Sequence, residues 1–462
     1  MPISQIFAKH GEKAFRALES EALRIATAPI VALGGGALLD EENRAFAEAN
    51  GAVVVLDVPE EEIARRIAKD APVRPLGDML ARRRAHYASF NLHADCDTRV
   101  IMPVKLRGAV KVPDSKSHLH RLMIADFLAT RRLRYRAAPG ECEDIAATRR
   151  CLAALADDAQ SNPVLDCGES GSTLRFLAPV AAALGKTPQF IRRGRLAERP
   201  MLDYSHLAPG VHSLSGNVSS QFVTGLLFAL PLLEGDSSIV LSSPLESRGY
   251  VDMTLAVLRE YGIEVHERKG AFDVPGRQQY TPSAQPGKVE ADWSAATFWI
   301  AANALGANVD VLGLDDASLQ PDSSMRSLTD RIIKADGSTI DVSQSPDLFP
   351  ALAVVAAATP GITHFTGAAR LRIKESDRIA AMERTLGAFG VQVSSTRDEV
   401  IVHGKASPWQ SCEIDAMNDH RIAMAGAIAS TLADGPVMIH GACCVAKSYP
   451  LFWEDFSRLS QQ

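Results

Sequence analysis

This 462-residue sequence has few cysteines, no long apolar run and no excess of positive charge. Its seven Cys form no C-x-x-C pair and are odd in number, which favours a reduced, cytoplasmic protein over a disulfide framework. No apolar stretch approaches the roughly 18–20 residues that span a bilayer, and no signal-peptide pattern opens the chain. Lys and Arg total 49 against 55 Asp and Glu, and this net charge of -6 removes the electrostatic reason to expect a nucleic-acid partner.

Several catalytic motifs are also missing. No G-x-G-x-x-G follows a predicted strand, and no H-E-x-x-H or Cys/His cluster suggests a zinc site. Gly185-Lys186-Thr187 resembles the end of a P-loop, but Val180 stands where the first glycine is needed. The sequence therefore gives no support for a dinucleotide enzyme, a zinc hydrolase or a P-loop enzyme.

Composition and length predict several globular domains. Hydrophobic residues make up 46% and charged residues 23%, which is ordinary for globular proteins, and 462 residues are about three domains' worth. The first part of the chain alternates a helix over residues 11–26, strands at 29–33 and 52–56, and a helix beginning near Pro59. Such alternation predicts a parallel α/β sheet. The pattern changes after Asp95-Cys96-Asp97, and we place a domain boundary near residue 98.

Six segments after residue 100 are apolar on nearly all sides and predict helices buried inside a domain. They begin near His118, Leu174, Gln221, Ser294, Leu348 and His420. The β-branched stretches between them predict strands, for example at residues 238–241, 309–312 and 400–402. Spacings of about 47–73 residues exclude a fixed-period solenoid and fit a repeated α/β module with loops of variable length.

Short polar residues precede each of these six segments, and basic residues stand beside them. For any one helix, N-capping alone explains the polar residues. Six buried helix starts that converge would instead form a cleft selective for anions, because the N-terminal N–H groups carry partial positive charge. The basic residues are Lys116, Arg121, Arg175, Arg199, Arg248, Lys374, Arg378, Arg421 and Lys447. For Lys374 to Arg378, the simple alternative is a set of surface ion pairs.

At these motifs the chain resembles the 5-enolpyruvylshikimate-3-phosphate (EPSP) synthase family of the shikimate pathway, the target of glyphosate. The resemblance covers about residues 103–456 and rests on eight motifs in the family's order: DSKSHLHR, CGESGSTLRF, ERP, GNVSSQFVTGLL, SPDLFP, RIKESDR, NDHRIAM and KSYP. It implies an α/β, two-lobed enolpyruvyl transferase fold of six βαβαββ modules, an inside-out α/β barrel with its active site between the lobes. The expected lobes are residues 114–288, and residues 101–113 plus 289–462.

The reaction implied is transfer of the enolpyruvyl group of phosphoenolpyruvate to the 5-hydroxyl of shikimate 3-phosphate, with release of phosphate. By resemblance, Asp347 takes the hydroxyl proton, and Lys116 and Glu375 handle the proton at C3. The residues expected at shikimate 3-phosphate are Lys116, Ser117, Arg121, Ser219, Ser220, Gln221, Ser247, Asp347 and Lys374. Those expected at phosphoenolpyruvate are Lys116, Gly171, Arg199, Gln221, Arg378, Arg421 and Lys447. No metal or organic cofactor is implied.

Two departures from the family pattern concern single residues, and two concern chain length. Glu169 and Arg370 stand where better-known members carry Asn, which leaves their contacts open. The links 203–217 and 322–341 are shorter than usual, so strands of a module are expected to be missing there. Because every charged motif residue is present, we expect the chemistry of the cleft to survive.

Residues 1–95 resemble a different enzyme, the C-terminal part of shikimate kinase. The resemblance rests on GEKAFRALE, the strand that ends in three glycines, Arg74-Pro75-Leu76, and Arg83 four residues before Tyr87. It implies a truncated, partial parallel-sheet α/β kinase-like domain over residues 1–98. In that family Arg74 lies in the lid over the nucleotide, and shikimate is surrounded by the residues that here are Arg16, Gly34, Gly35, Gly36 and Arg83. Kinase activity is not expected, because this chain has no P-loop.

Three rival interpretations stay open. The sister transferase that acts on UDP-N-acetylglucosamine shares the fold, but it normally carries a Cys at the equivalent of residues 193–199, where this chain has none. The chain could also be a catalytically impaired binding or scaffolding remnant of a bifunctional kinase–transferase. Residues 1–95 could serve as a shikimate-binding regulatory domain. In each case we expect a cytoplasmic monomer with small-molecule ligands and neither nucleic-acid nor membrane partners.

Overall fold

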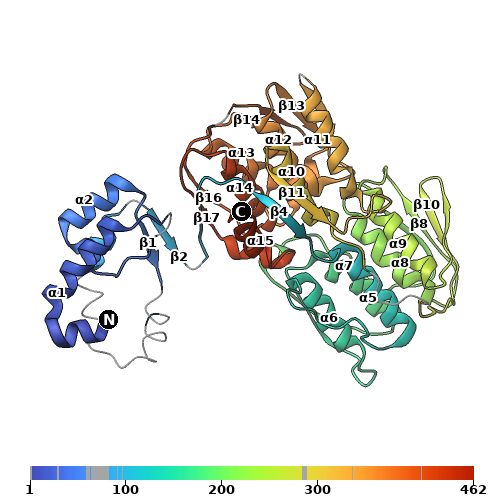
Figure 1. The fold of residues 1–462 in the computed structure, drawn as a ribbon. Helices are drawn as coiled ribbons and strands as arrows, with labels where there is room; N and C mark the ends of the chain where they lie inside the picture. Colours follow the sequence, from blue (N-terminus) through green and yellow to red (C-terminus); the bar gives the residue numbers. More distant parts are fainter. Residues whose placement is uncertain are drawn as a thin grey trace. The chain divides into compact units, whose positions relative to one another are not determined.

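The computed structural model describes residues 3–28, 31–58, 63, 83–90, 92–95, 97–283, 289–335, 337–406 and 408–461 (Figure 1). By its contacts the chain divides into two compact units, Met1–Arg99 and Val100–Gln462. We call them the N-terminal unit and the C-terminal unit. None of the described helices combines the length and the apolarity that crossing a bilayer requires.

The N-terminal unit is a small α/β layer. Its elements are α1 (Ile3–Ile25), the 3-10 turn η1 (Ala37–Leu39), α2 (Glu41–Asn50), β1 (Val54–Asp57) and β2 (Leu92–Asp95). β1 and β2 pair in parallel, as expected for an α/β sheet. Buried Leu23, Leu38 and Phe90 form its core among the described residues.

One sequence prediction for this unit is confirmed and one needs correction. α1 consists of two helices separated by a kink at Gly11, whose backbone is not helical and whose φ of 75° suits glycine, and the second of them corresponds to the helix predicted over residues 11–26. The strand predicted at 29–33 is not a strand over its described residues 31–33, and Val31 and Leu33 are exposed there. A strand needs a neighbour to pair its backbone groups, and apolar composition does not supply one. The helix predicted near Pro59 lies outside the described residues.

The C-terminal unit contains the six apolar helices that the sequence predicts. They are α5 (Lys116–Thr130), α7 (Gly171–Ala183), α8 (Ser220–Ala229), α10 (Trp293–Ala304), α12 (Phe349–Ala358) and α14 (His420–Ala429). All six are buried over most of their length, as predicted from their all-round apolarity. More amphipathic helices complete the unit: α6 (Glu143–Leu155), α9 (Arg248–Glu260), α11 (Met325–Lys334), α13 (Arg378–Ala388) and α15 (Phe452–Ser460).

The strands form small sheets at the outside of these helices (Figure 1). β5 (Val164–Gly168) pairs with β6 (Gln189–Arg192), and the order β7 (Gly210–Leu214), β8 (Ser237–Leu241), β10 (Ala271–Val274), β9 (His266–Arg268) makes a second sheet. The order β12 (Ser338–Asp341), β13 (Ile362–Thr366), β15 (Val400–His403), β14 (Val393–Ser395) makes a third. β16 (Glu413–Asp415), β17 (Val437–His440) and β3 (Arg99–Ile101) form a fourth, and β11 (Asn308–Leu312) pairs with β4 (Arg107–Lys111). Of the described elements, β7 lies in the first short link, and the 3-10 turn η4 (Pro321–Ser324), α11 and β12 lie in or at the start of the second.

In the described part of the C-terminal unit, buried apolar side chains gather in two clusters. One comes from residues 122–280, and the other from residues 101–112 and 295–459. We call the corresponding parts lobe 1 and lobe 2. β4 belongs to lobe 2 because it pairs in parallel with β11, with Arg107 opposite Asn308. The boundaries of the lobes at residues 114–288, and 101–113 plus 289–462, stay a prediction.

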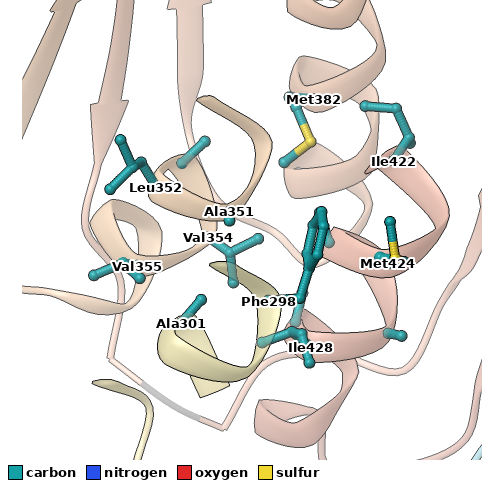
Figure 2. Close-up of a cluster of buried hydrophobic side chains, with 14 of the residues drawn as sticks. Phe298, Ala301, Ala351, Leu352, Val354, Val355, Met382, Ile422, Met424 and Ile428 are labelled. Carbon is teal, nitrogen blue, oxygen red and sulfur yellow. The ribbon is translucent and has the colours of Figure 1, made fainter. Parts of the chain in front are cut away.

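Small side chains let the central helices approach closely. Figure 2 shows Phe298 and Ala301 of α10 meeting Ala351 of α12 and Ile428 of α14 in lobe 2. In lobe 1, α8 lies so near α7 that a Cβ on Gly225 would stand 2.2 Å from the carbonyl oxygen of Arg175. This packing fixes the helix starts relative to one another, and those starts carry the polar residues considered next.

Candidate active site

The helix starts of both lobes meet at one cavity of the C-terminal unit. Five of the six apolar helices begin with a side-chain cap, in which the oxygen of Ser115, Ser170, Ser219, Asp292 or Asp419 accepts a backbone N–H bond. α12 has no such cap and is preceded by a 3-10 turn, η5 (Pro346–Leu348), that carries Asp347. The polar residues at the helix starts thus cap their helices and also lie at a shared cavity. For any single helix, the sequence required only the capping.

The cavity is lined by the predicted site residues of both lobes, except Arg378 and Lys447. Its lining includes Lys116, Ser117, Arg121, Gly171, Arg199, Ser219, Ser220, Gln221, Ser247, Asp347, Lys374, Glu375 and Arg421. These two residues lie outside the lining, where Arg378 pairs with the Asp347 carboxylate and Lys447 pairs with Glu169.

Asp347 is surrounded by cations. Its Oδ1 lies 2.7 Å from Arg378 Nη1 and 3.2 Å from Lys374 Nζ, and its Oδ2 lies 3.0 Å from Arg421 Nη2. Burial alone would raise the pKa of Asp347, but Arg421, Lys374 and Arg378 bring this pKa well below its ordinary value. The free protein therefore holds Asp347 as a carboxylate.

Glu375 is held ionised in a similar way. Arg378 Nη2 lies 2.6 Å from its carboxylate, and Arg199 Nη2 lies 3.7 Å away from the opposite lobe. Burial would raise the pKa of Glu375, whereas Arg378, Arg199 and Lys374 lower it well below the ordinary value. The pair Glu375–Arg378 has the predicted i,i+3 spacing, but Arg378 is only 1% exposed and is not a surface residue.

Lys116 is held as a cation. Its Nζ donates to Asp144 Oδ2 at 2.8 Å, and its backbone N–H donates to Asp292 Oδ2. Burial would lower the pKa of Lys116, but the Asp144 carboxylate raises it above its ordinary value. Nearby His420 is buried, which lowers its pKa to about 3 and leaves it neutral. A protonated amine therefore faces the cavity beside a neutral ring.

Three guanidinium groups in the part of the chain that the structure describes keep a buried Nε with no hydrogen-bond partner and no ion pair at that atom. They belong to Arg175, Arg199 and Arg421, whereas the buried Nε of Arg370 pairs with Glu246. Burial, together with Arg199, lowers the pKa of Arg175 to about 10. Unpaired N–H groups of cations are costly in a protein interior, and a ligand with anionic oxygens would satisfy them. The cavity is therefore suited to anions.

Comparison with known sequences shows the family of the chain that carries this cavity. The sequence model described as EPSP synthase (3-phosphoshikimate 1-carboxyvinyltransferase) matches residues 205–456. A 3-phosphoshikimate 1-carboxyvinyltransferase of Clostridioides difficile is 36% identical over 424 residues, which cover 78% of this chain and 96% of the relative. The chain belongs to the EPSP synthase family. A relative of the same name from Clostridium kluyveri is 39% identical, with 78% and 96% covered.

The fold of this EPSP synthase family member agrees with solved structures. An EPSP synthase from Acinetobacter baumannii matches with a TM-score of 0.62 at 24% identity, covering 79% of this chain and 98% of that one. The enolpyruvyl transferase fold expected from the sequence is thereby confirmed. Residues 1–101 match the model described as shikimate kinase, so the N-terminal unit is a shikimate kinase-like domain.

Five titratable side chains that the sequence motifs did not assign to a substrate also line the EPSP synthase cavity. They are Asp144, Arg175, Tyr250, Asp292 and Arg370. Arg175 and Asp292 stand at helix starts, so the convergence of these starts could have indicated them. Asp144 could not have been found in this way, because an acidic residue in the first turn of a helix, here α6, is common in surface helices.

Two residues expected at shikimate 3-phosphate, Gln221 and Ser247, are held by neighbouring side chains outside the predicted set. Arg175 Nη1 donates to Gln221 Oε1 at 2.6 Å, and Gln221 Nε2 donates to the Ser172 hydroxyl. Arg370 Nη2 donates to the hydroxyl of Ser247, a residue held at a left-handed φ of 55°. In this family member, Arg370 thus fixes the position of a predicted ligand residue from the other lobe.

The N-terminal unit brings its predicted residues together as well. The carbonyl oxygen of Gly35 accepts from Arg83 Nη1 at 2.9 Å and from the Tyr87 hydroxyl. A Cβ on Gly36 would stand 2.6 Å from Arg16 Nη2, and one on Gly34 would stand 2.6 Å from the Glu19 carboxylate. The glycines therefore leave room beside two arginines. Arg74, expected in a nucleotide lid, lies outside the described residues.

Proposed function

We propose that the C-terminal unit transfers the enolpyruvyl group of phosphoenolpyruvate to the 5-hydroxyl of shikimate 3-phosphate and releases phosphate. Its lobes in this proposal are residues 114–288, and residues 101–113 plus 289–462. The observation that carries the proposal is the Asp347 carboxylate, which stands among three cations in a cavity lined by both lobes. That arrangement offers a base within a site that selects anions.

The two substrates divide the cavity between them in this proposal. Arg121 would serve the shikimate side: its Nε donates to Thr254 and its Nη2 to the Tyr250 carbonyl, so its position is fixed before ligand arrives. The full set for shikimate 3-phosphate is Lys116, Ser117, Arg121, Ser219, Ser220, Gln221, Ser247, Asp347 and Lys374. The set for phosphoenolpyruvate is Lys116, Gly171, Arg199, Gln221, Arg378, Arg421 and Lys447.

Asp347 is the base for the acceptor hydroxyl. In the free protein its low pKa makes it a weak base, because three cations stabilise its charge. Bound phosphate and carboxylate groups would neutralise Lys374 and Arg421 and so raise the pKa of Asp347. The carboxylate becomes a stronger base only when both substrates are present, and this couples proton removal to complete binding.

Lys116 is the acid for C3 of the enol. The hydroxyl oxygen bonds to C2 as Asp347 takes its proton, while Lys116 protonates C3 to a methyl group. The tetrahedral intermediate then returns a proton from C3, and the C2–O bond to phosphate breaks. Glu375 is ionised in the free protein, so it is suited to accept the C3 proton in this second step. The phosphate and carboxylate oxygens carried by C2 would lie among Arg199, Arg378 and Arg421 throughout these steps.

A coupled phosphate-release assay tests this function. Phosphate should appear only when phosphoenolpyruvate and shikimate 3-phosphate are both present, and UDP-N-acetylglucosamine should not replace the acceptor. Absence of turnover with both substrates would refute the proposal and favour a binding or scaffolding role. Phosphate release from phosphoenolpyruvate with UDP-N-acetylglucosamine as acceptor, but not with shikimate 3-phosphate, would favour the sister transferase.

For the N-terminal unit we propose shikimate binding without phosphoryl transfer. Arg16, Gly34, Gly35, Gly36 and Arg83 would surround the ligand, and the clamp on the Gly35 carbonyl supports this. The 462 residues contain no G-x-x-x-x-G-K-[ST] loop to hold nucleotide phosphates. Calorimetric titration with shikimate should show binding that the substitution Arg83→Ala removes. No heat of binding would leave this unit without a ligand role.

We also propose that the protein acts as a monomer in the cytoplasm. Both substrate sets lie within one chain, so the proposed reaction requires no partner subunit. Light scattering after size-exclusion chromatography should give a mass near 49.6 kDa. A mass of twice that value or more would reject the monomer.

A further inference from the structure

One ion pair joins the two lobes beside the cavity. Glu169 of lobe 1 lies between β5 and the start of α7, and its Oε2 stands 2.8 Å from Lys447 Nζ of lobe 2. Asn418 of lobe 2 donates its Nδ2 to both oxygens of the same carboxylate at 3.2 Å. Gly171, two residues after Glu169, and Ser448, next to Lys447, both line the cavity. The pair is therefore at the edge of the proposed phosphoenolpyruvate site.

The two partners of this pair differ in how readily they can leave it. The Lys447 side chain is 8% exposed, and its Nζ also donates to the Asn418 carbonyl at 2.7 Å. The Glu169 side chain is 33% exposed. Moving a carboxylate that is already partly hydrated costs little, whereas leaving a buried ammonium unpaired costs much more. When an anion competes for Lys447, Glu169 is thus the group that yields.

We propose that Glu169 is a built-in counter-ion of Lys447 that phosphoenolpyruvate must displace, so that Glu169 sets the affinity for this substrate. The inference rests on the proposed function, in which Lys447 binds phosphoenolpyruvate. With Glu169 in place, Lys447 is already neutralised, and an incoming anion gains only the difference between two ion pairs. Without the carboxylate, the same anion would gain the full free energy of its ion pair with Lys447.

A second ion pair between the lobes gives a comparison. Arg370 of lobe 2 pairs with Glu246 of lobe 1, and it also donates to the Ser247 hydroxyl and the Ser343 carbonyl. It therefore joins the lobes on the side of the residues proposed for shikimate 3-phosphate. If joining the lobes were all that Glu169 does, loss of either pair would weaken binding of both substrates. Counter-ion exchange instead predicts that loss of Glu169 strengthens binding of one.

The test is the substitution Glu169→Gln, which keeps the shape and removes the charge. We expect the KM for phosphoenolpyruvate to fall about three- to tenfold, with the KM for shikimate 3-phosphate within about twofold of wild type. The unfolding temperature without ligand should fall, and the increase caused by phosphoenolpyruvate should become larger. The increase in unfolding temperature caused by phosphoenolpyruvate distinguishes the two roles, because loss of a purely structural pair would not make it larger.

Two variants serve as controls. Asp166→Asn removes one negative charge from β5, but Asp166 pairs with Arg193 of the same lobe, so the KM for phosphoenolpyruvate should not change. Glu246→Gln removes the pair with Arg370, which also joins the lobes, and should not lower that KM either. An equal fall in Asp166→Asn would mean that general charge, and not exchange at Lys447, sets the affinity.

Two results would overturn the inference. One is a KM for phosphoenolpyruvate in Glu169→Gln that is unchanged or raised while the wild-type protein turns over. If the wild type fails to turn over, the proposed function is wrong, and the thermal shift with phosphoenolpyruvate still decides the role of Glu169. Equal shifts in wild type and variant would then overturn it.

Discussion

The buried pair Arg378–Asp419 makes a quantitative prediction about lobe 2. Arg378 Nε lies 2.8 Å from Asp419 Oδ2, and the side chains are 1% and 0% exposed. The Asp419 carboxylate also accepts from the Ser376 hydroxyl and caps α14 through the backbone N–H of Arg421. Asp419→Ala removes an ion pair, a hydroxyl partner and a helix cap at once.

The expected cost follows from these contacts. Breaking a buried ion pair by removing one partner costs about 3–5 kcal/mol, and losing a helix cap costs about 1 kcal/mol. Asp347 and Glu375 still face Arg378 in the variant, so the ion-pair loss belongs at the lower end of its range. We therefore expect the free energy of unfolding to fall by about 4 kcal/mol.

Asp377→Ala is the matched control. Asp377 also caps a helix, α13, and also pairs with an arginine, Arg372, but the two side chains are 35% and 29% exposed. Its loss should cost about 1–2 kcal/mol, because an exposed pair contributes at most about 1 kcal/mol beyond the cap.

Urea unfolding followed by tryptophan fluorescence measures both variants. All four tryptophans, Trp293, Trp299, Trp409 and Trp453, lie in lobe 2, so the signal reports the unfolding of that lobe. If Asp419→Ala and Asp377→Ala agreed within about 1 kcal/mol, burial would not be what makes the Arg378 pair strong, and the reasoning would be refuted.

Two further predictions concern catalysis and pH. Asp347→Asn should lower kcat by about 10²–10⁴, because the acceptor hydroxyl loses its base; a kcat near that of wild type in the phosphate-release assay would remove Asp347 from this role. Burial lowers the pKa of His420 to about 3 from a model-compound value of 6.5. Between these two values the unfolded chain binds a proton that the folded chain does not, so stability falls as pH falls, by up to about 1.4 kcal/mol per pH unit. His420→Gln should flatten this slope between pH 6 and 4 in urea titrations, whereas His266→Gln, at an exposed position of β9, should not; equal slopes in wild type and His420→Gln would contradict the assignment.

The main helices could be predicted from the sequence because their signal is local. A helix that is apolar on all sides must be buried wherever it lies, so α7 and α12 were recognised without knowledge of their neighbours. The strand predicted at residues 29–33 was wrong over its described part, residues 31–33, because a strand depends on a partner that local composition does not specify. For Lys374 to Arg378, spacing predicted the Glu375–Arg378 pair correctly but not its burial, which Asp419 and Asp347 make tolerable.

The ion pairs that tune the site could not be predicted in this way. Lys116 meets Asp144, and Glu169 meets Lys447, across separations of 28 and 278 residues. Within one helical turn, spacing determines which side chains meet, but over such distances only the packing of whole lobes does. The family motifs indicated that Lys116 and Lys447 belong to the site, and left unknown which carboxylates balance them.

The pairing of β4 with β11 has a consequence for synthesis of the protein on the ribosome. Residues 107–111 are made well before residues 308–312, and at roughly 5–20 residues per second the delay is about 10–40 s. Lobe 1 can complete its own core during this time, because all of its buried residues lie between the two strands. β4 meanwhile has no partner and presents unpaired backbone groups, which are a template for aggregation. During synthesis, β4 is therefore a segment at which the unfinished chain is exposed to aggregation.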